Sequence, residues 1–193
     1  MQLLIKVILP ILLVLIAAIG WVIYATGHEV VSTVKTVNPQ AGKGRALIVW
    51  HPGQSNFPER VMNAFAAGLM ANGWRVEMTT ASVQSPADIS GYGLLVLGSP
   101  VYWSAPARPI SNYLKRLGDL HGKQTVILLM ASGNSDDAMN KIKTRTAEAH
   151  GQIAVALSLY RWRPNRENAT GDNEMIAVEI AQQAAKEIKP IAD

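Results

Sequence analysis

The chain has 193 residues, a formal net charge of +4 at pH 7 and no cysteine. This length suits one domain with an appendage better than two full domains. The absence of cysteine excludes disulfides, thiol catalysis and cysteine-ligated metal. The positive charge is small and dispersed, so it does not indicate nucleic-acid binding, although a mildly basic surface near a membrane is attracted to anionic lipid.

A long apolar segment lies near the N-terminus. Residues 7–24, VILPILLVLIAAIGWVIY, contain no charged side chain. This is near the length that a helix needs to cross the hydrocarbon of a bilayer. Pro10 falls in the first turns, where a missing N–H costs little, and Trp21 and Tyr24 lie at the far end, where amphipathic aromatics prefer the headgroup layer. We predict a transmembrane anchor over residues 1–27, with membrane lipid as the partner of residues 7–24.

A cleaved signal peptide is the alternative for this segment. Lys6 supplies a basic residue before the apolar run, and Ala18-Ile19-Gly20 or Ala25-Thr26-Gly27 would be weak cleavage sites. The run is longer than the usual apolar part of a signal peptide and ends in aromatic residues, which favours an uncleaved single-pass anchor. Basic residues flank both ends, so the charge pattern determines the orientation only weakly.

The rest of the chain alternates between apolar runs and amphipathic stretches. Residues 28–44 have no helical period and predict a linker that is partly extended, followed by one domain over residues 45–193. Runs typical of buried strands cover residues 46–50, 74–79, 94–97, 125–130 and 153–157. Helical periodicity covers residues 58–72, the stripe from Ile110 to Leu117, residues 135–150 and residues 174–188. Residues 82–92 predict a loop, and Gly98-Ser99-Pro100 is expected to end the third strand.

Strands that alternate with helices require a mostly parallel sheet with helices on both faces. The pattern therefore predicts an α/β domain: a three-layer, doubly wound, five-stranded parallel sheet with the strand order 2-1-3-4-5, preceded by one transmembrane helix. In such sheets the ligand crevice lies at the carboxyl ends of the strands that flank the switch point. The loops 51–58, 98–109 and 131–137 are therefore the candidate binding loops.

Residues 94–117, LLVLGSPVYWSAPARPISNYLKRL, resemble the third strand and the second flavin-binding loop of the flavodoxin family. The resemblance extends over residues 45–188 in the order and spacing of elements, and its strongest motif is GSPVYW at residues 98–103. It implies a flavodoxin-like fold, FMN as the cofactor, and electron transfer or the oxidoreduction of quinones and NAD(P)H. In that family this loop lies along the isoalloxazine ring, so the resemblance implies ring contacts from Pro100, Val101, Tyr102 and Trp103. Tyr102 or Trp103 would stack on the ring, unless these aromatics only cap the end of the sheet.

The loop after the first strand corresponds to the phosphate loop of flavodoxins, a Thr/Ser-x-Thr-Gly-Asn-Thr turn at a helix N-terminus. The cofactor-binding residues that the resemblance implies here are His51, Gly53, Gln54, Ser55, Asn56 and Phe57. Pro58 replaces a threonine and removes a backbone donor. The alternative is that Asn56 and Glu59 form a capping box, in which case the loop needs no ligand.

The loop after the fourth strand corresponds to the second ring-contacting loop of the family, which implies binding residues Ser132, Gly133 and Asn134. Gly133 permits a close approach of backbone or a positive φ angle. Ser135 or Asp136 is expected to be the N-cap of the next helix.

Three other features of the sequence favour different functions only weakly. A serine nucleophile at Ser55 has the right strand-to-helix setting, but Phe57 stands where that motif requires glycine, and His121 and His150 have no evident acidic partner. The arginine- and aromatic-rich stretch 160–166 is expected to be a solvated loop before the last helix. The histidines are scattered along the chain, so no metal site is predicted.

The leading hypothesis is a membrane-anchored, FMN-binding redox protein whose partner is a membrane redox protein or a quinone. A reduced nicotinamide donor would place the domain on the cytoplasmic side. No residue is assigned as a catalytic acid or base, because the flavin would carry the chemistry. The alternative, indicated by the altered phosphate loop, is a flavodoxin-like domain without cofactor that serves as a binding or scaffold module at the membrane.

Overall fold

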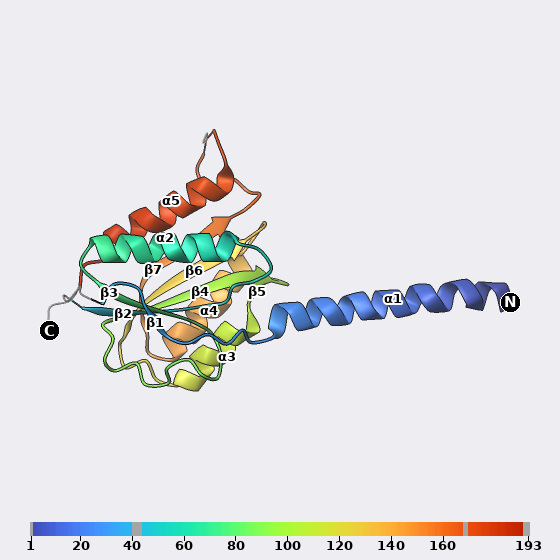
Figure 1. The fold of residues 1–193 in the computed structure, drawn as a ribbon, viewed down its shortest axis with the longest axis horizontal. Coiled ribbons are helices and arrows are strands. Elements are labelled where there is room, and N and C mark those ends of the chain that lie inside the picture. Colours follow the sequence, from blue (N-terminus) through green and yellow to red (C-terminus); the bar gives the residue numbers. More distant parts are fainter. Residues whose placement is uncertain (1, 40–43, 168–169, 191–193) are drawn as a thin grey trace.

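A computed structural model describes residues 2–39, 44–167 and 170–190 (Figure 1). The helices are α1 (Gln2–Gly27), α2 (Phe57–Ala71), α3 (Arg108–Leu117), α4 (Asp136–Glu148) and α5 (Asn173–Lys186). The strands are β1 (Lys35–Thr36), β2 (Arg45–Trp50), β3 (Arg75–Thr80), β4 (Leu94–Tyr102), β5 (Ala105–Pro106), β6 (Gln124–Ala131) and β7 (Gln152–Tyr160). Residues 82–92 form a loop, as the sequence predicts.

The strands form one sheet in the order β1-β3-β2-β4-β6-β7, with β5 paired to β4. The five strands predicted from the sequence are parallel to their neighbours and lie in the predicted order 2-1-3-4-5. The structure adds two short antiparallel strands, β1 at the edge beside β3 and β5 in a hairpin with β4. The predicted three-layer, doubly wound α/β fold is confirmed.

Each face of the sheet has its own core. Along β2, Ala46 and Ile48 pack under α2 and α5, whereas Leu47 and Val49 pack under α3 and α4. This alternation explains why the strand is apolar throughout, since both of its faces are covered. Figure 1 shows α2 and α5 lying side by side on one face. Gly68 of α2 allows this close approach, because a Cβ there would lie 2.3 Å from the carbonyl oxygen of Gln182.

The third predicted strand does not end at Gly98-Ser99-Pro100. Strand β4 continues to Tyr102, because residues 98–100 stay in register with residues 128–130 of β6. A Cβ on Gly98 would lie 2.4 Å from the Met62 sulfur, so glycine at this position allows α2 to pack closely on the sheet. Trp103 and Ser104 then form a two-residue hairpin turn with φ angles of 51° and 55°. Both residues thus adopt the left-handed conformation that a type I′ turn requires.

The last predicted strand is also longer than the sequence indicates. Strand β7 covers Gln152–Tyr160 and forms the edge of the sheet opposite β1. Its final residues pair with the end of β6, since Tyr160 lies opposite Ala131. The chain therefore leaves β7 at Arg161, at the same edge of the sheet as the loops that follow β2 and β4.

The segment between the N-terminal helix and β2 is held against the sheet in its described part. The Val37 N–H donates to the Val76 carbonyl at 2.9 Å, and the Asn38 side chain accepts from the Val76 N–H at 2.8 Å. Further along, the Ser32 hydroxyl accepts from the Thr80 N–H at 2.9 Å. The segment that the sequence predicts as a linker therefore fixes the end of α1 relative to the domain.

Helix α1 contains a span, Lys6–Tyr24, that is long and apolar enough to cross a membrane, and none of its 19 residues is buried. At 1.5 Å per residue the span is roughly 28 Å long, close to the thickness of the hydrocarbon layer. In Figure 1, α1 projects away from the domain on the side where β4 and β5 lie. Its last turn reaches the domain near the start of α3.

Candidate site at the carboxyl edge of the sheet

A cleft of about 280 Å³ lies at the carboxyl ends of β2, β4, β6 and β7. Seven of the predicted cofactor-binding residues line it, from three different loops. They are Gln54, Ser55, Phe57, Pro100, Val101, Tyr102 and Ser132. The fold thus brings the three candidate loops together at the switch point, as the strand order requires.

The other six predicted residues do not line this cleft. His51 is buried beneath the loop, Gly53 lies behind Tyr102, and Asn56 is the first residue before α2. Gly133 and Asn134 are exposed beyond the end of β6. Trp103 is at the tip of the hairpin, where its side chain is 82% exposed.

The sequence did not predict that Arg161 and Trp162 belong to the wall of the cleft. They follow β7, whose predicted end at residue 157 was too early. A signal was present in the sequence, because any residue directly after a parallel strand lies at the carboxyl edge of the sheet. The stretch is largely exposed, as predicted, with Trp162 76% exposed, and it also contributes Arg161 and Trp162 to the wall of the cleft. Its conformation is held by Asn165, whose side chain donates to the carbonyl oxygens of Tyr160 and Asn173.

The predicted capping box at the start of α2 is not formed. Asn56 has φ −75° and ψ −6°, and its side chain makes no capping hydrogen bond. A side-chain cap needs an extended backbone at this position, which Asn56 lacks. Among the described residues, the N–H groups of Ser55, Asn56 and Phe57 have no hydrogen-bond acceptor. Free N–H groups at the positive end of a helix dipole form a site suited to an anion.

The loop that carries these donors is anchored from below by His51. Its Nδ1 accepts the Gly53 N–H at 3.0 Å. Because Nδ1 is the acceptor, Nε2 carries the hydrogen, and it lies 3.3 Å from the carbonyl oxygen of His28. Burial lowers the pKa of His51, partly offset by the hydrogen bond to His28. The imidazole is therefore neutral at pH 7 and holds the loop in place through both nitrogens.

Tyr102 closes the loop from the side of β4. Gly53 has φ 69°, and a Cβ there would lie 3.1 Å from the Tyr102 hydroxyl. Burial raises the pKa of Tyr102, while a hydrogen bond from the Gln54 backbone lowers it in part. The Tyr102 hydroxyl thus lies beside the backbone of Gln54, in the same loop. The ring itself forms part of the wall of the cleft.

Two arginines and one glutamate lie beside the cleft. Glu174 at the start of α5 pairs with Arg60 of α2 at 2.7 Å and with Arg161 at 2.6 Å. Both carboxylate oxygens are thereby engaged, and the cluster keeps a net positive charge. Glu59, the acidic neighbour of Arg60, is exposed to solvent, where its charge is screened.

A second cavity, of about 210 Å³, separates the end of α1 from the hairpin. Ile23 and Thr26 line it from α1, and Tyr102 and Trp103 line it from the hairpin. Tyr102 therefore belongs to the walls of both cavities. Tyr102 is thus the residue shared by the cleft and by the cavity beside the end of the apolar helix.

The loop after β6 differs from its predicted role in one respect. Ser135 precedes α4, but its hydroxyl donates to the Ser158 hydroxyl at 2.7 Å and makes no capping bond. The Asn134 side chain instead accepts the Asp136 N–H at 2.8 Å. Gly133 has no positive φ, and a Cβ there would meet no atom within 4 Å. The fold itself therefore does not require glycine at this position.

The expectation that the histidines lack an acidic partner is wrong. Asp119 lies 3.0 Å from His150 and 3.6 Å from His121. These residues precede β6 and β7, at the amino ends of the strands, whereas Ser55 follows β2 at the carboxyl end. Neither His121 nor His150 therefore lies beside Ser55. In the described part of the chain, no group of three His, Cys, Asp or Glu residues is arranged to hold a metal ion.

No family model matches the chain, and no curated protein sequence matches it. Many solved structures have a similar fold. An NAD(P)H:quinone oxidoreductase from Methanothermobacter marburgensis has a TM-score of 0.56 and 14% identity, covering 76% of this chain and 99% of its own. The two-electron reduced flavodoxin of Megasphaera elsdenii has a TM-score of 0.56 and 20% identity, covering 72% of this chain and 98% of its own.

The chain has a flavodoxin-like fold. A flavodoxin from the domain Archaea is a further structural neighbour, with a TM-score of 0.57, 12% identity, and coverage of 74% of this chain and 97% of its own. The flavodoxin-like architecture predicted from the GSPVYW motif and the order of elements is thus confirmed.

Proposed function

We propose that this chain is a membrane-anchored, FMN-binding redox protein that exchanges electrons with a quinone or a redox partner at the membrane. The observation that carries the proposal is the position of Tyr102, which lines both the cleft at the switch point and the cavity beside α1. The similarity in fold to flavodoxins and to an NAD(P)H:quinone oxidoreductase supports it.

The residues at the start of α2 fit the phosphate of FMN. Three free N–H groups, from Ser55, Asn56 and Phe57, surround a helix N-terminus, and the Ser55 hydroxyl lines the cleft beside them. The net positive cluster of Arg60, Arg161 and Glu174 adds long-range attraction for an anion. Pro58 supplies no donor, but its position in the first turn leaves these three N–H groups intact.

The rest of the cleft fits an aromatic ring system. Tyr102 and Trp162 offer aromatic faces, and Pro100 and Val101 contribute apolar surface between them. The cleft volume of about 280 Å³ is just below the range of about 300–1,000 Å³ for ligand sites, so part of the ligand would extend out of the cleft. Bound FMN would supply electron or hydride transfer, while these side chains position the ring and exclude water. No side chain in the cleft needs to act as an acid or a base.

The anchor places this cleft at a membrane surface. If residues 6–24 span the bilayer, the last turn of α1 lies in the headgroup layer, and Tyr102 is directly adjacent to it. A lipophilic quinone could then approach from the side of α1, through the cavity lined by Ile23 and Trp103. This arrangement explains why a flavodoxin-like domain is fixed to its helix by the docked segment 28–38.

The alternative function, a cofactor-free binding module, rests on the donors that the loop has lost. Pro58 has no N–H, so the first turn of α2 offers one backbone donor fewer than it would with threonine at this position. The double variant Asn56→Gly/Pro58→Thr discriminates between the two functions. Binding of FMN by this variant alone, and not by the unmodified chain, would favour the binding module.

Titration of FMN fluorescence with the full chain in detergent tests the proposed ring contacts. Tyr102→Ala and Trp162→Ala are each expected to weaken FMN binding three- to tenfold, because an aromatic stack is worth about 1 kcal/mol beyond area burial. Trp103→Ala is the matched control, since this tryptophan lies outside the cleft and should leave affinity nearly unchanged. Equal affinity in all three variants would show that the ring does not bind in this cleft.

A further inference from the structure

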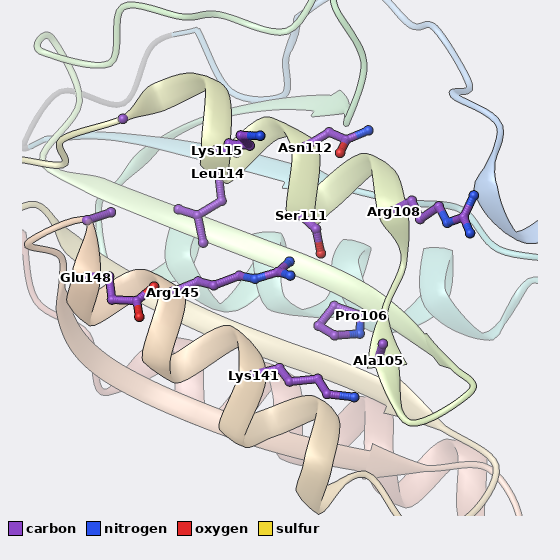
Figure 2. A pocket seen from close by; sticks show the side chains of 12 residues that line it. Ala105, Pro106, Arg108, Ser111, Asn112, Leu114, Lys115, Lys141, Arg145 and Glu148 are labelled. Atoms are coloured by element: carbon purple, nitrogen blue, oxygen red, sulfur yellow. The ribbon is translucent and has the colours of Figure 1, made fainter.

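A second binding site is indicated by the groove between α3 and α4. This cavity has a volume of about 680 Å³ and shares no lining residue with the cleft at the carboxyl edge. Figure 2 shows Ser111 and Leu114 on α3 pointing toward Arg145 and Lys141 on α4, while Asn112 and Lys115 extend from the other side of α3. Its volume lies well within the range of small-molecule sites.

The groove carries an excess of positive charge that the described residues do not neutralise. Arg108, Lys115, Lys141 and Arg145 line it, against a single acidic residue, Glu148. Within residues 2–39, 44–167 and 170–190, none of these cations is in an ion pair, and their one polar side-chain contact is the bond from Lys141 Nζ to the Ser104 carbonyl at 2.9 Å. An anion in the groove would relieve this mutual repulsion.

One of these cations stands at a position that opposes helix stability. Arg108 is the first residue of α3, at the positive end of the helix dipole, and that first turn contains no acidic residue. Lys141 and Arg145 are four residues apart on α4, so their charges repel each other, although Arg145 also lies in the last turn, where a cation is favourable. An anion in the groove would compensate for the position of Arg108 and for the repulsion on α4.

The chemistry of the lining favours a phosphate. Arginine forms paired hydrogen bonds with phosphate oxygens, and lysine adds a compact charge. The Ser111 hydroxyl and the Asn112 amide supply neutral donors, while Pro106 and Leu114 provide apolar surface. A phosphodiester with an apolar extension matches this combination.

The groove opens beside the end of the apolar helix. A Cβ on Gly27 would lie 3.4 Å from Cδ of Arg108, so Arg108 packs directly against the last turn of α1. Ala105, Pro106 and Arg108 line both the groove and the cavity that Ile23 and Thr26 close. In an anchored protein, this end of the groove lies at the level of the headgroups.

We propose that the α3–α4 groove binds the phosphate of an anionic phospholipid headgroup and thereby fixes the orientation of the domain on the membrane. This inference rests on the proposed anchor, but it is independent of flavin binding. The lipid would hold the carboxyl edge of the sheet, and with it the cleft, toward the bilayer.

The test uses the full chain in nanodiscs of phosphatidylcholine, with and without phosphatidylglycerol. Thermal unfolding is followed by circular dichroism, because a ligand that binds only the folded state raises Tm. Phosphatidylglycerol is expected to raise Tm by about 3 °C, as for other bound ligands of modest affinity. The variant Arg108→Gln/Arg145→Gln should lose this rise. The control Lys143→Gln/Lys189→Gln removes the same charge from exposed positions outside the groove and should keep it.

Three results would overturn the proposal: no rise in the unmodified chain, a rise that survives Arg108→Gln/Arg145→Gln, or an equal loss in the control variant. If inorganic phosphate produces the same rise in phosphatidylcholine discs, the ligand is a soluble phosphate and the lipid assignment is wrong. If α1 does not anchor the chain in the membrane, the chain will not co-elute with the discs, which is a separate measurement. Failure of flavin binding is seen in the visible spectrum and does not affect Tm measured without FMN.

Discussion

Nε2 of His51 donates to the carbonyl oxygen of His28, 3.3 Å away, and so joins the phosphate-loop side of the cleft to the first residue after α1. The other ring nitrogen accepts the Gly53 N–H of that loop. The ring of His28 in turn stacks on Tyr24, in the last turns of the apolar helix, at a centroid distance of 4.9 Å. One neutral imidazole therefore connects the proposed anchor with the proposed cofactor site.

This link predicts that FMN retention depends on the protonation of His51. Its pKa is lowered in the folded state by burial, so the folded state binds this proton less readily than the unfolded chain. The stabilising contribution is complete above the unfolded value of about 6.5 and is lost as pH falls through the lower folded value. Protonation places a hydrogen on Nδ1, opposite the Gly53 N–H, and should release the loop. We expect FMN affinity, measured by fluorescence, to fall as pH decreases through the lowered pKa of His51, below the ordinary histidine value of about 6.5.

The variant His51→Gln separates this effect from the titration of the exposed histidines. It should bind FMN more weakly at pH 7 and show a flatter pH profile. An unchanged pH profile in His51→Gln would assign the titration to another group.

Close packing of α2 on α5 predicts that Gly68→Ala destabilises the protein. In a helix interior this change ordinarily stabilises by about 1 kcal/mol. Here the new methyl group would lie 2.3 Å from the Gln182 carbonyl oxygen and 2.6 Å from the Ala185 Cβ. Overpacking of this kind costs about 1–3 kcal/mol, so the sign of the effect should reverse. Gly133→Ala, where the new Cβ meets no atom, is the control for urea unfolding. A Gly68→Ala protein more stable than the parent would contradict the close approach of these helices.

The buried carboxylate of Glu77 predicts that the free energy of unfolding decreases at acidic pH. It accepts from the Tyr92 hydroxyl at 2.7 Å and pairs with Arg45 at 3.1 Å. Burial alone would raise the pKa of Glu77, but the hydrogen bonds from Tyr92 and Arg45 outweigh it and lower the pKa. The contribution is therefore present above the unfolded value of about 4.3 and is lost as pH falls below it.

Glu77→Gln should reduce the free energy of unfolding at pH 7 by about 1–3 kcal/mol, the usual value for hydrogen bonds to a charged group. The loss should shrink at pH 3, where the parent carboxylate is protonated in the unfolded chain. Glu59→Gln, at an exposed position, is the control and should change little at either pH. A loss that is equal at both pH values would mean that the charge of Glu77 is irrelevant.

The docking of residues 28–38 on β3 predicts that truncation there destabilises the domain. A chain that begins at His28 keeps β1 and its hydrogen bonds to Val76 and Thr80, whereas a chain that begins at Gly44 exposes this edge of the sheet. Each lost hydrogen bond is worth about 1 kcal/mol, and each kcal/mol shifts Tm by roughly 2–4 °C. We expect the shorter chain to unfold several degrees lower by circular dichroism. Equal Tm values would show that the segment is only a linker.

The three central strands, β2, β4 and β6, could be predicted because a strand covered on both faces is apolar along most of its length. Strand β1 could not be predicted, because the two residues Lys35 and Thr36 are too few to show a pattern. They pair only because the edge of β3 is available. The extension of β4 through Gly98 and Pro100 could not be predicted either, because it also depends on pairing with another strand. These are turn residues by local preference, and the register with β6 overrides that preference.

Strand order determines the switch point, so the position of the site on the sheet could be predicted from the sequence. The residue types alone could not show that the Asn56 side chain leaves the helix uncapped, because capping depends on the backbone angles of that residue. Nor could they place Trp103 outside the cleft, since this follows from the two-residue turn that ends β4. Arg161 and Trp162 were missed because the end of β7 was placed too early.

The most direct test of the account is the visible absorption spectrum of the purified full chain in detergent, after incubation with FMN and desalting. The proposed function predicts retained flavin absorbance at about one equivalent per chain, as expected of a single cleft. A protein that is folded by circular dichroism but colourless after desalting would contradict it, and would leave the cofactor-free binding module as the better account of the cleft.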